Sequence, residues 1–201
     1  MLDGVVRRAI DPPLDRLSGW LTAAGLSANV ITLGGFAVGV AAVPLLALEW
    51  YGPALGVILV NRLADGLDGA VARRTGATDL GGYLDIVCDF VFYAAVVFGC
   101  ALARPENARP AAFLILAFVG TGTTFLAYAV IAAKRGITTA AQGRKSLYYL
   151  GGLTEGTETI ILFVAISLFP DAFAPLAYGF GALCWITTAS RMLAAARSFR
   201  G

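Results

Sequence analysis

Six long apolar segments constrain this chain more than any other feature of its sequence. Each is close to the length that an α-helix needs to cross about 30 Å of hydrocarbon. The residues are 58% hydrophobic and 14% charged, and a soluble domain would carry about 25% charged residues. We therefore predict an all-α membrane protein with six transmembrane helices. The expected spans are Val30–Leu48, Pro53–Ala72, Gly81–Ala103, Ala111–Ala133, Leu153–Phe169 and Phe173–Ala195.

The amino-terminal segment, residues 1–22, has a different pattern. From Leu2 to Thr22, apolar residues alternate with charged ones at roughly helical spacing, and Pro12 and Pro13 interrupt the pattern. This predicts an amphipathic helix that lies on the membrane surface and is broken near the prolines; a linker facing the solvent is the alternative. The mixed charges do not resemble a cleavable signal peptide. Residues 1–201 are expected to form a single transmembrane domain.

The basic residues predict the orientation of the chain. Every lysine and arginine except Arg104 and Arg109 falls in segments that would share one side of the membrane. Because cytoplasmic segments are enriched in basic residues, both termini are expected in the cytoplasm, as an even number of spans requires. We expect an integral protein of the cell (inner) membrane with a cytoplasmic site. Histidine is absent, so any general base must be a carboxylate or another side chain.

Four aspartates interrupt two of the expected spans. Asp65 and Asp68 are three residues apart near the cytoplasmic end of the second span, and Asp85 and Asp89 are four apart near the start of the third. Each spacing places both carboxylates on one helix face, about one turn apart. Counting along each helix from its outer end puts Asp65 and Asp89 at nearly the same depth. The two pairs are therefore expected to face one cavity that opens to the cytoplasm.

Four carboxylates at such depth require a cation. One ionised aspartate at mid-membrane costs about 3 kcal/mol on insertion scales, and like charges add repulsion. All-oxygen ligation suits Mg²⁺, Mn²⁺ or Ca²⁺ and does not suit zinc. Gly66 and Gly69 are expected to leave room for a bulky ligand, and Arg73 is suited to phosphate. A solvated helix end would explain one aspartate but not four on coincident faces, so the pattern indicates metal-dependent phospho-transfer.

At these residues the sequence resembles the CDP-alcohol phosphotransferase family of integral membrane enzymes. The family signature is D-x-x-D-G-x-x-A-R followed by G-x-x-x-D-x-x-x-D. The segment between Arg73 and Gly81 is shorter than is usual in the family. The matching residues are Asp65, Asp68, Gly69, Ala72, Arg73, Gly81, Asp85 and Asp89.

The resemblance implies a function for each of these residues. Asp65, Asp68 and Asp85, with help from Asp89, would hold one or two Mg²⁺ or Mn²⁺ ions, and Asp89 would also be the general base. A substituted phospho-group, here expected to be phosphatidyl from CDP-diacylglycerol, would pass to an alcohol with release of CMP, in phospholipid biosynthesis. Residues expected to contact the CDP donor are Asn29, Thr32, Gly69, Arg73 and Thr78; an ordinary helix start is the alternative for Asn29 and Thr32.

The acceptor is less constrained by the sequence. Basic residues could bind the phosphate of a glycerol- or inositol-phosphate acceptor, although a basic cytoplasmic loop explains most of them equally well. Two glutamates that lead directly into an apolar span could bind a polyol or a cationic acceptor, or could pair with nearby basic residues. The candidate acceptor residues are Arg144, Lys145, Glu155, Glu158 and Arg191.

Two other functions are compatible with parts of this pattern. Intramembrane carboxylates could serve a cation transporter or channel, but the outer halves of the second and third spans are apolar. A non-catalytic membrane scaffold is the other alternative. The complete set of aspartates argues against it, because buried charge lowers stability and a scaffold would have no use for it. The expected partners are a CDP-linked lipid donor, an alcohol acceptor and membrane lipid, with no nucleic acid. The resemblance also implies a homodimer.

Overall fold

The computed structural model describes residues 3–136 and 152–199, and every regular element in this part of the chain is helical. The predicted all-α class is therefore confirmed. The helices are α1 (Asp3–Ala23), α2 (Ala28–Val40), α3 (Ala42–Ala47), α4 (Tyr51–Thr75), α5 (Asp79–Ala103), η1 (Pro105–Asn107), α6 (Ala108–Lys134), α7 (Gly156–Leu168), η2 (Pro170–Ala172) and α8 (Phe173–Ser198).

Four helical stretches are long and apolar enough to cross a membrane: Ala28–Ala47, Asp79–Ala103, Pro105–Lys134 and Pro170–Ser198. The other two expected spans differ from these in one property each. Helix α4 has 25 residues, but its charged side chains lower its hydropathy, whereas α7 is apolar but has only 13 residues. An integral membrane protein is thus confirmed, and the count of six spans stays a prediction.

The first expected span is a helix with a break in it. Helix α2 begins at Ala28, where the Ser27 hydroxyl accepts a hydrogen bond from the Val30 amide. It ends at Val40, and α3 follows after Ala41. Pro44 has no N–H to donate to the carbonyl four residues earlier, so the regular hydrogen bonding of the helix is interrupted here.

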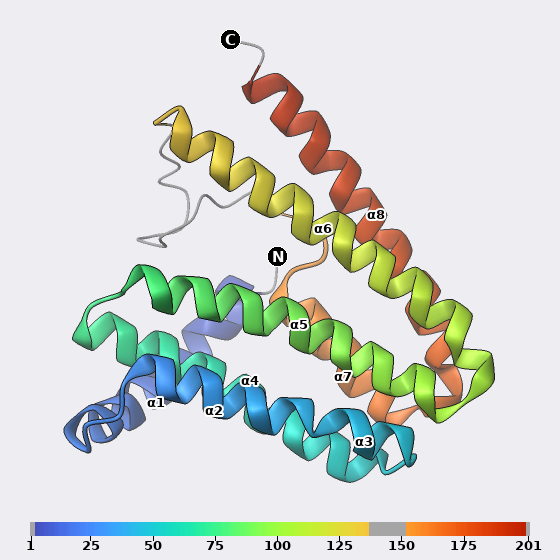
Figure 1. Ribbon diagram of the computed structural model, residues 1–201, viewed down its shortest axis with the longest axis horizontal. Helices are drawn as coiled ribbons and strands as arrows, with labels where there is room; N and C mark the ends of the chain where they lie inside the picture. The colour runs from blue at the N-terminus through green and yellow to red at the C-terminus, as the bar shows by residue number, and fades with distance from the viewer. Residues whose placement is uncertain (1–2, 137–151, 200–201) are drawn as a thin grey trace.

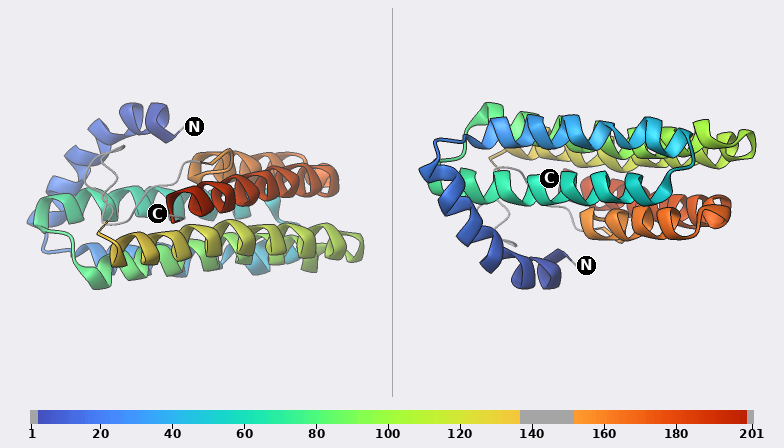
Figure 2. Two further views of the ribbon diagram at one scale, coloured as in Figure 1. Left: turned by 90° about the horizontal axis from the view of Figure 1, so that it is seen from above. Right: turned by 90° about the horizontal axis from the view of Figure 1, so that it is seen from below.

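The helices form two layers (Figure 2). Helices α2, α3, α5 and α6 lie in one layer, and α4, α7 and α8 lie in the other. The pairs α6 and α8, and α2 and α4, are the most extensively packed. Helices α6 and α8 begin close to the ends of α5 and α7. Toward their carboxyl ends they diverge from the other helices (Figure 1).

The hydrophobic core occupies the middle of the bundle and the end away from the aspartates. Ile58, Phe92, Val96, Phe163 and Phe173 are fully buried or nearly so, and Phe92 meets Phe163 edge to face. Many large apolar side chains also remain on the outside of the helices. This distribution suits a bundle surrounded by lipid, because lipid accepts apolar side chains that water would not.

Two glycines of α2 allow it to approach α4 closely. A Cβ atom on Gly35 would collide with the Ala64 side chain, and one on Gly39 would lie 2.7 Å from the Asn61 amide nitrogen. Small residues permit this kind of approach between membrane helices. The close contact places the start of α2 beside the aspartates of α4.

Helix α1 packs against the outside of α4. Leu14 and Ser18 are buried at this contact, while Trp20 is 80% exposed, so the helix has two distinct faces. The Arg74 side chain donates hydrogen bonds to the Ser18 hydroxyl at 2.8 Å and to the Asp15 carbonyl at 2.6 Å. The segment is therefore a packed helix and not a linker, and its place on the membrane surface stays a prediction.

The expected break at Pro12 and Pro13 is also wrong, because α1 runs unbroken from Asp3 to Ala23. Proline fixes φ near −65°, which is a helical value. The helix therefore continues through both prolines with the loss of their backbone hydrogen bonds.

An exposed ion-pair cluster joins three connections at the end of the bundle opposite to the aspartates. Arg104 donates to Glu49 Oε2 from Nη2 at 2.6 Å and from Nε at 3.0 Å. Its Nη1 donates to Asp171 Oδ1 at 2.6 Å. The cluster links the α3–α4 connection, the end of α5 and η2.

Candidate metal centre

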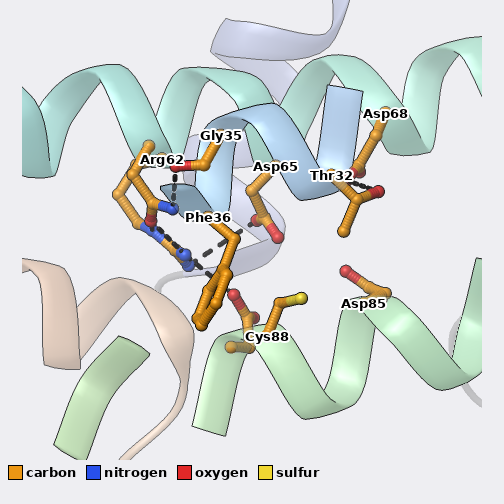
Figure 3. A pocket seen from close by; sticks show the side chains of 10 residues that line it. Thr32, Gly35, Phe36, Arg62, Asp65, Asp68, Asp85 and Cys88 are labelled. Atoms are coloured by element: carbon orange, nitrogen blue, oxygen red, sulfur yellow. Dashed lines mark hydrogen bonds and ion pairs between the residues drawn. The ribbon is translucent and has the colours of Figure 1, made fainter. Parts of the chain in front are cut away.

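Three of the four aspartates lie together between α4 and α5. Asp65, Asp68 and Asp85 each offer one carboxylate oxygen, and these oxygens all lie within 4.8 Å of one another. Figure 3 shows the two side chains of α4 and the one from α5 pointing toward the same space. The helical spacing and the equal depth expected from the sequence thus lead to one group of carboxylates.

Asp68 is the buried member of this group, and Thr32 of α2 holds it in place. The Thr32 hydroxyl lies 2.5 Å from Asp68 Oδ2 and 3.0 Å from the Ala28 carbonyl. A hydroxyl has one proton to donate, and its bond to an ionised carboxylate is the stronger of the two. The nearest described partner of Thr32 is therefore an aspartate. Its expected contact with a donor stays a prediction.

The fourth aspartate has a different partner. Asp89 Oδ1 accepts a hydrogen bond from Arg62 Nη2 at 2.8 Å, and Arg62 Nη1 lies 3.8 Å from Asp65 Oδ2. The Arg62 side chain is only 8% exposed. In the sequence, Arg62 indicated only the orientation of the chain, and its place in the site was not predicted. Its position inside an apolar span, three residues before Asp65, was the available signal.

The guanidinium group of Arg62 is held by neighbours on two helices. Its Nε and Nη2 donate to Asn61 Oδ1 at 2.8 and 2.5 Å, and its Nη1 donates to the Tyr93 hydroxyl at 3.2 Å. It also lies over the rings of Phe92 and Tyr93, at 4.7 and 5.2 Å from their centroids. Asn61 in turn donates from Nδ2 to the Gly35 carbonyl of α2 at 2.9 Å.

These side chains line a small, partly open recess. In Figure 3, Arg62 lies on one side of it and Asp68 with Thr32 on the other. The recess thus has four carboxylates and one guanidinium group in its wall. The lining residues are Thr32, Gly35, Phe36, Asn61, Arg62, Asp65, Asp68, Asp85, Cys88 and Asp89.

Gly66 and Gly69, which were both expected to leave room for a ligand, have different environments. A Cβ atom on Gly69 would meet only Arg73 Nη1, at 3.5 Å, so the expected space beside Gly69 is present. A Cβ on Gly66 would lie 2.8 Å from a methyl group of Leu14. The expectation that Gly66 leaves room for a ligand is wrong, because α1 occupies that side of α4.

Two other expected donor residues meet at the start of α5. Thr78 precedes the helix, and its hydroxyl accepts a hydrogen bond from the Gly81 amide at 3.0 Å. A Cβ on Gly81 would lie 3.0 Å from the Thr78 hydroxyl and 3.1 Å from Asn29 Oδ1. The signature glycine therefore leaves room for the side chains of Asn29 and Thr78 beside the start of α5. A donor contact of either side chain stays a prediction.

Three of the expected acceptor residues lie in the described part of the chain, away from the recess. Arg191 of α8 is largely buried and donates from Nη1 to the Thr121 carbonyl of α6 at 3.0 Å. Glu155 and Glu158 form a capping box at the start of α7, in which Glu158 Oε2 accepts from the Glu155 amide at 3.1 Å. The helix start thus uses both glutamates for its own capping. A contact of either glutamate with an acceptor stays a prediction. Arg144 and Lys145 lie outside the described residues.

Comparison with known proteins places the chain in one family. Residues 25–193 match the family described as CDP-alcohol phosphatidyltransferase. The inner membrane protein YnjF of Escherichia coli is 55% identical over 193 residues, which cover 96% of this chain and 94% of that protein. Archaetidylinositol phosphate synthase of Pyrococcus horikoshii is 31% identical over 192 residues, covering 93% of each.

Solved structures show the same arrangement of helices. The Mycobacterium tuberculosis phosphatidylinositol phosphate synthase with CDP-DAG bound matches with a TM-score of 0.68 and 26% identity, covering 90% of this chain and 92% of that one. A structure of the same enzyme in complex with manganese and citrate matches with a TM-score of 0.68 at 24% identity, covering 90% and 88%.

Proposed function

Because the chain belongs to the CDP-alcohol phosphatidyltransferase family, we propose that it transfers a phosphatidyl group from CDP-diacylglycerol to an alcohol and releases CMP. The observation that carries this proposal is the group of three carboxylate oxygens within 4.8 Å in a recess between α4 and α5. The proposed place of the reaction is phospholipid biosynthesis. The related enzyme with CDP-DAG bound supports the same donor for this chain.

We propose Mg²⁺ or Mn²⁺ as the cofactor, held by Asp65, Asp68 and Asp85. The residues fit such an ion, because hard divalent cations prefer carboxylate oxygens and the three side chains already converge. The Thr32 hydroxyl orients Asp68 toward this group. When bound, the metal would neutralise negative charge on the diphosphate of the donor. Asp89 lies beside this group and could serve as a further ligand, a base or both.

The proposed donor site extends from the recess toward the ends of α4 and α5. Gly69 presents backbone without a side chain, and Arg73 beside it offers a planar cation for phosphate oxygens. Asn29 and Thr78 both lie beside Gly81 and would border the CDP group there. Thr32 would act through Asp68.

We propose Asp89 as the general base. The acceptor hydroxyl would attack the phosphorus distal to cytidine and pass its proton to Asp89. The bond between that phosphorus and the bridging oxygen would break, and the bridging oxygen would leave with the electron pair as part of CMP. The other residues mainly position the reactants and balance charge, as is usual in phosphoryl transfer.

The proposed acceptor is an alcohol that carries a phosphate. The names of the related archaeal and mycobacterial synthases support an inositol phosphate as one member of this class. Arg191 is the described residue that best suits the phosphate, because its side chain is held between α8 and α6 and carries a permanent charge. The proposed set is completed by Arg144, Lys145, Glu155 and Glu158.

We also propose the topology of six spans, with α4 and α7 as the second and fifth spans and both termini in the cytoplasm. Helix α4 has 25 residues, which is long enough to cross the hydrocarbon, and its charges face the recess or the helix end. Helix α1 would lie on the cytoplasmic surface of the cell membrane, with exposed Trp20 toward lipid. A homodimer is proposed from the family alone.

Release of CMP from CDP-diacylglycerol by the full chain in lipid vesicles tests this function. We expect release to require Mg²⁺ or Mn²⁺ and an added alcohol acceptor, and to be lost in Asp68→Asn. Screening glycerol phosphate and inositol phosphate would identify the acceptor. Cation flux into the vesicles without CMP release would contradict the proposal and support a transporter. The buried apolar core beyond the recess argues against a path for ions.

A further inference from the structure

The last parts of α6 and α8, residues 125–134 and 191–198, leave the bundle together and are called the inner segments below. Helices α6 and α8 are the most extensively packed pair, and both diverge from the other helices toward their carboxyl ends (Figure 1). We propose that the two inner segments form one unit that swings about a hinge and closes over the recess between α4 and α5. The motion is a property of the fold, whereas its purpose, closing the site around substrates, rests on the proposed function.

A weak stretch in the middle of α6 marks the hinge. Residues 120–124 read Gly-Thr-Gly-Thr-Thr, and both residue types are poor helix formers. The three threonine hydroxyls all donate to carbonyl groups of their own helix, three or four residues earlier in the chain. The bonds run from Thr121 to Phe118 at 3.0 Å, from Thr123 to Val119 at 2.7 Å and from Thr124 to Gly120 at 2.8 Å. Bonds of this kind compete with the backbone hydrogen bonds and favour bending of a helix.

Helix α8 has a similar stretch at the same level. Residues 187–190 read Thr-Thr-Ala-Ser, and the hydroxyls of Thr188 and Ser190 donate to earlier carbonyl groups of the same helix at 2.9 and 2.8 Å. The two stretches face each other, because a Cβ on Gly120 would lie 3.0 Å from Thr188 Oγ1. Two packed helices that bend easily at one level are able to bend together.

Contacts between α6 and α8 continue beyond these stretches and hold the inner segments together. Arg191 Nη1 donates to the Thr121 carbonyl at 3.0 Å, and the guanidinium group lies 5.8 Å from the centroid of the Phe125 ring. Near the carboxyl ends, the Tyr128 ring stacks on Phe199, which follows α8, with centroids 5.0 Å apart. The inner segments would therefore move as one body.

The hinge lies level with the recess. A Cβ on Gly122 would lie 2.8 Å from the ring of Phe90 in α5, and Phe90 directly follows Asp89, which lines the recess. The part of α5 that precedes Phe90 carries the exposed Asp85, and α6 diverges from this part (Figure 1). A swing of the inner segments toward α5 would therefore bring them over the side on which Asp85 is exposed.

Helix geometry sets the size of the expected motion. Ala133 lies about 14 Å along the helix beyond Thr124, at about 1.5 Å per residue. A change of about 20° in the bend of α6 would thus move Ala133 by about 5 Å.

Distances between spin labels in the full chain in lipid nanodiscs test this motion, with the three cysteines replaced by alanine. One pair, Leu80→Cys with Ala133→Cys, joins α5 to α6, and a second, Ala133→Cys with Ala196→Cys, joins the two inner segments; all three residues are exposed. Without ligand, the first distribution should be at least about twice as wide as the second. With Mn²⁺ and CDP-diacylglycerol, the first distance should shorten by about 5 Å and the second should stay within about 1 Å. Equal widths without ligand, or equal shifts with it, would overturn the proposal.

A matched pair of substitutions on one face of α6 tests the origin of the hinge. Thr123 and Val119 are one turn apart, β-branched and exposed, but only Thr123 has a hydroxyl. Thr123→Leu should reduce the ligand-induced shift by about half and CMP release by about threefold, because it removes a bond that favours bending. Val119→Leu should leave both unchanged. The same effect in both variants would overturn the proposal.

Hydrogen exchange of the unmodified chain provides a measurement that needs no cysteine substitution. Amides of residues 123–127, beside the hinge, should exchange at least about tenfold faster than those of residues 113–117 in the outer half of α6. Similar rates in the two groups would overturn the proposal.

The outcome is separable from that of the proposed function. If the first distribution is the wider one but the unmodified chain releases no CMP from CDP-diacylglycerol, the transferase proposal fails and the hinge stands. If CMP is released but the first distance does not shorten with Mn²⁺ and CDP-diacylglycerol, closure over the recess fails and the transferase proposal stands.

Discussion

Two arginines of this bundle are each held between two carboxylates, in very different surroundings. Arg62 is a residue of α4, and its side chain is 8% exposed. Arg104 is the residue after the end of α5, and its side chain is 29% exposed. The distances are similar, with shortest contacts of 2.8 and 2.6 Å. The partners are Asp65 and Asp89 for Arg62, and Glu49 and Asp171 for Arg104.

The comparison shows that the surroundings decide the effect of an ion pair more than its geometry does. Water screens the cluster of Arg104, so it contributes modestly to stability. Low-dielectric surroundings make the interactions of Arg62 strong, and removal of one partner leaves a buried charge. We therefore expect the loss of one partner to have a larger effect in the buried arrangement than in the exposed one.

The largest expected difference comes from making the same substitution at both ends of the bundle. Asp85→Asn removes a member of the carboxylate group and should lower CMP release about a thousandfold, as loss of several kcal/mol of metal-dependent stabilisation requires. Asp171→Asn changes an 89% exposed side chain and should leave CMP release unchanged. Initial rates in vesicles measure both. A similar loss of CMP release in both variants would contradict the expected difference between the two ends of the bundle.

A glycine substitution tests the support beneath Arg62. Gly39→Ala should destabilise the protein by about 1–3 kcal/mol, because its methyl group would press on Asn61 and Phe92. Gly34→Ala is the matched control on the same helix, since nothing lies within 4 Å of a Cβ there, and it should be neutral or slightly stabilising. Midpoints of thermal unfolding in detergent provide the measurement. If Gly34→Ala were destabilised as much as Gly39→Ala, the loss of stability at Gly39 could not be assigned to its contact with Asn61 and Phe92.

The anchor of α1 is expected to have an intermediate effect. Arg74→Ala removes two hydrogen bonds from α4 to α1 and should weaken the docking of α1 by about 1–2 kcal/mol. Hydrogen exchange in nanodiscs should then become faster at amides of residues 14–21, with little change in α5. Uniformly faster exchange along the chain would indicate general destabilisation instead.

The smallest effect is expected at Arg104. Its hydrogen bond holds the pKa of Glu49 below the ordinary value of a glutamate. A lowered folded-state pKa means that this stabilisation is complete above the unfolded pKa of about 4.3 and is lost as the pH falls through the folded value. Arg104→Gln should thus lower the unfolding midpoint slightly at pH 7, and the difference from the unmodified protein should vanish in strong acid. A difference that grows on acidification would contradict this assignment.

Much of the fold follows from features that are local in the sequence. Apolar segments of spanning length predicted the all-α class, and periodicity predicted that Asp65, Asp68 and Asp85 would meet. Helix spacing is sufficient to predict this group, because it places the carboxylates on one face of each helix, and those faces are turned toward each other when the two helices are adjacent. The break at Ala41 was missed, although Pro44 is a local signal for it.

The features that could not be predicted depend on contacts between distant segments. Arg62 looks like any basic residue until Asn61, Tyr93 and Asp89 are known to surround it. Gly66 resembles a ligand-facing glycine, but its neighbour is Leu14, which lies on a helix that the sequence places on the membrane surface. Neither pairing has a spacing that helix geometry alone would reveal.

The contact of Leu14 with Gly66 also bears on how the protein is made. Synthesis proceeds from the amino terminus, so α1 is made before its packing partner α4. Its main packing partner is α4, and the Arg74 anchor is near the end of that helix. An amphipathic helix in that interval is best accommodated at the lipid surface. The first helix to be synthesised is thus among the last of the amino-terminal half to find its final neighbours.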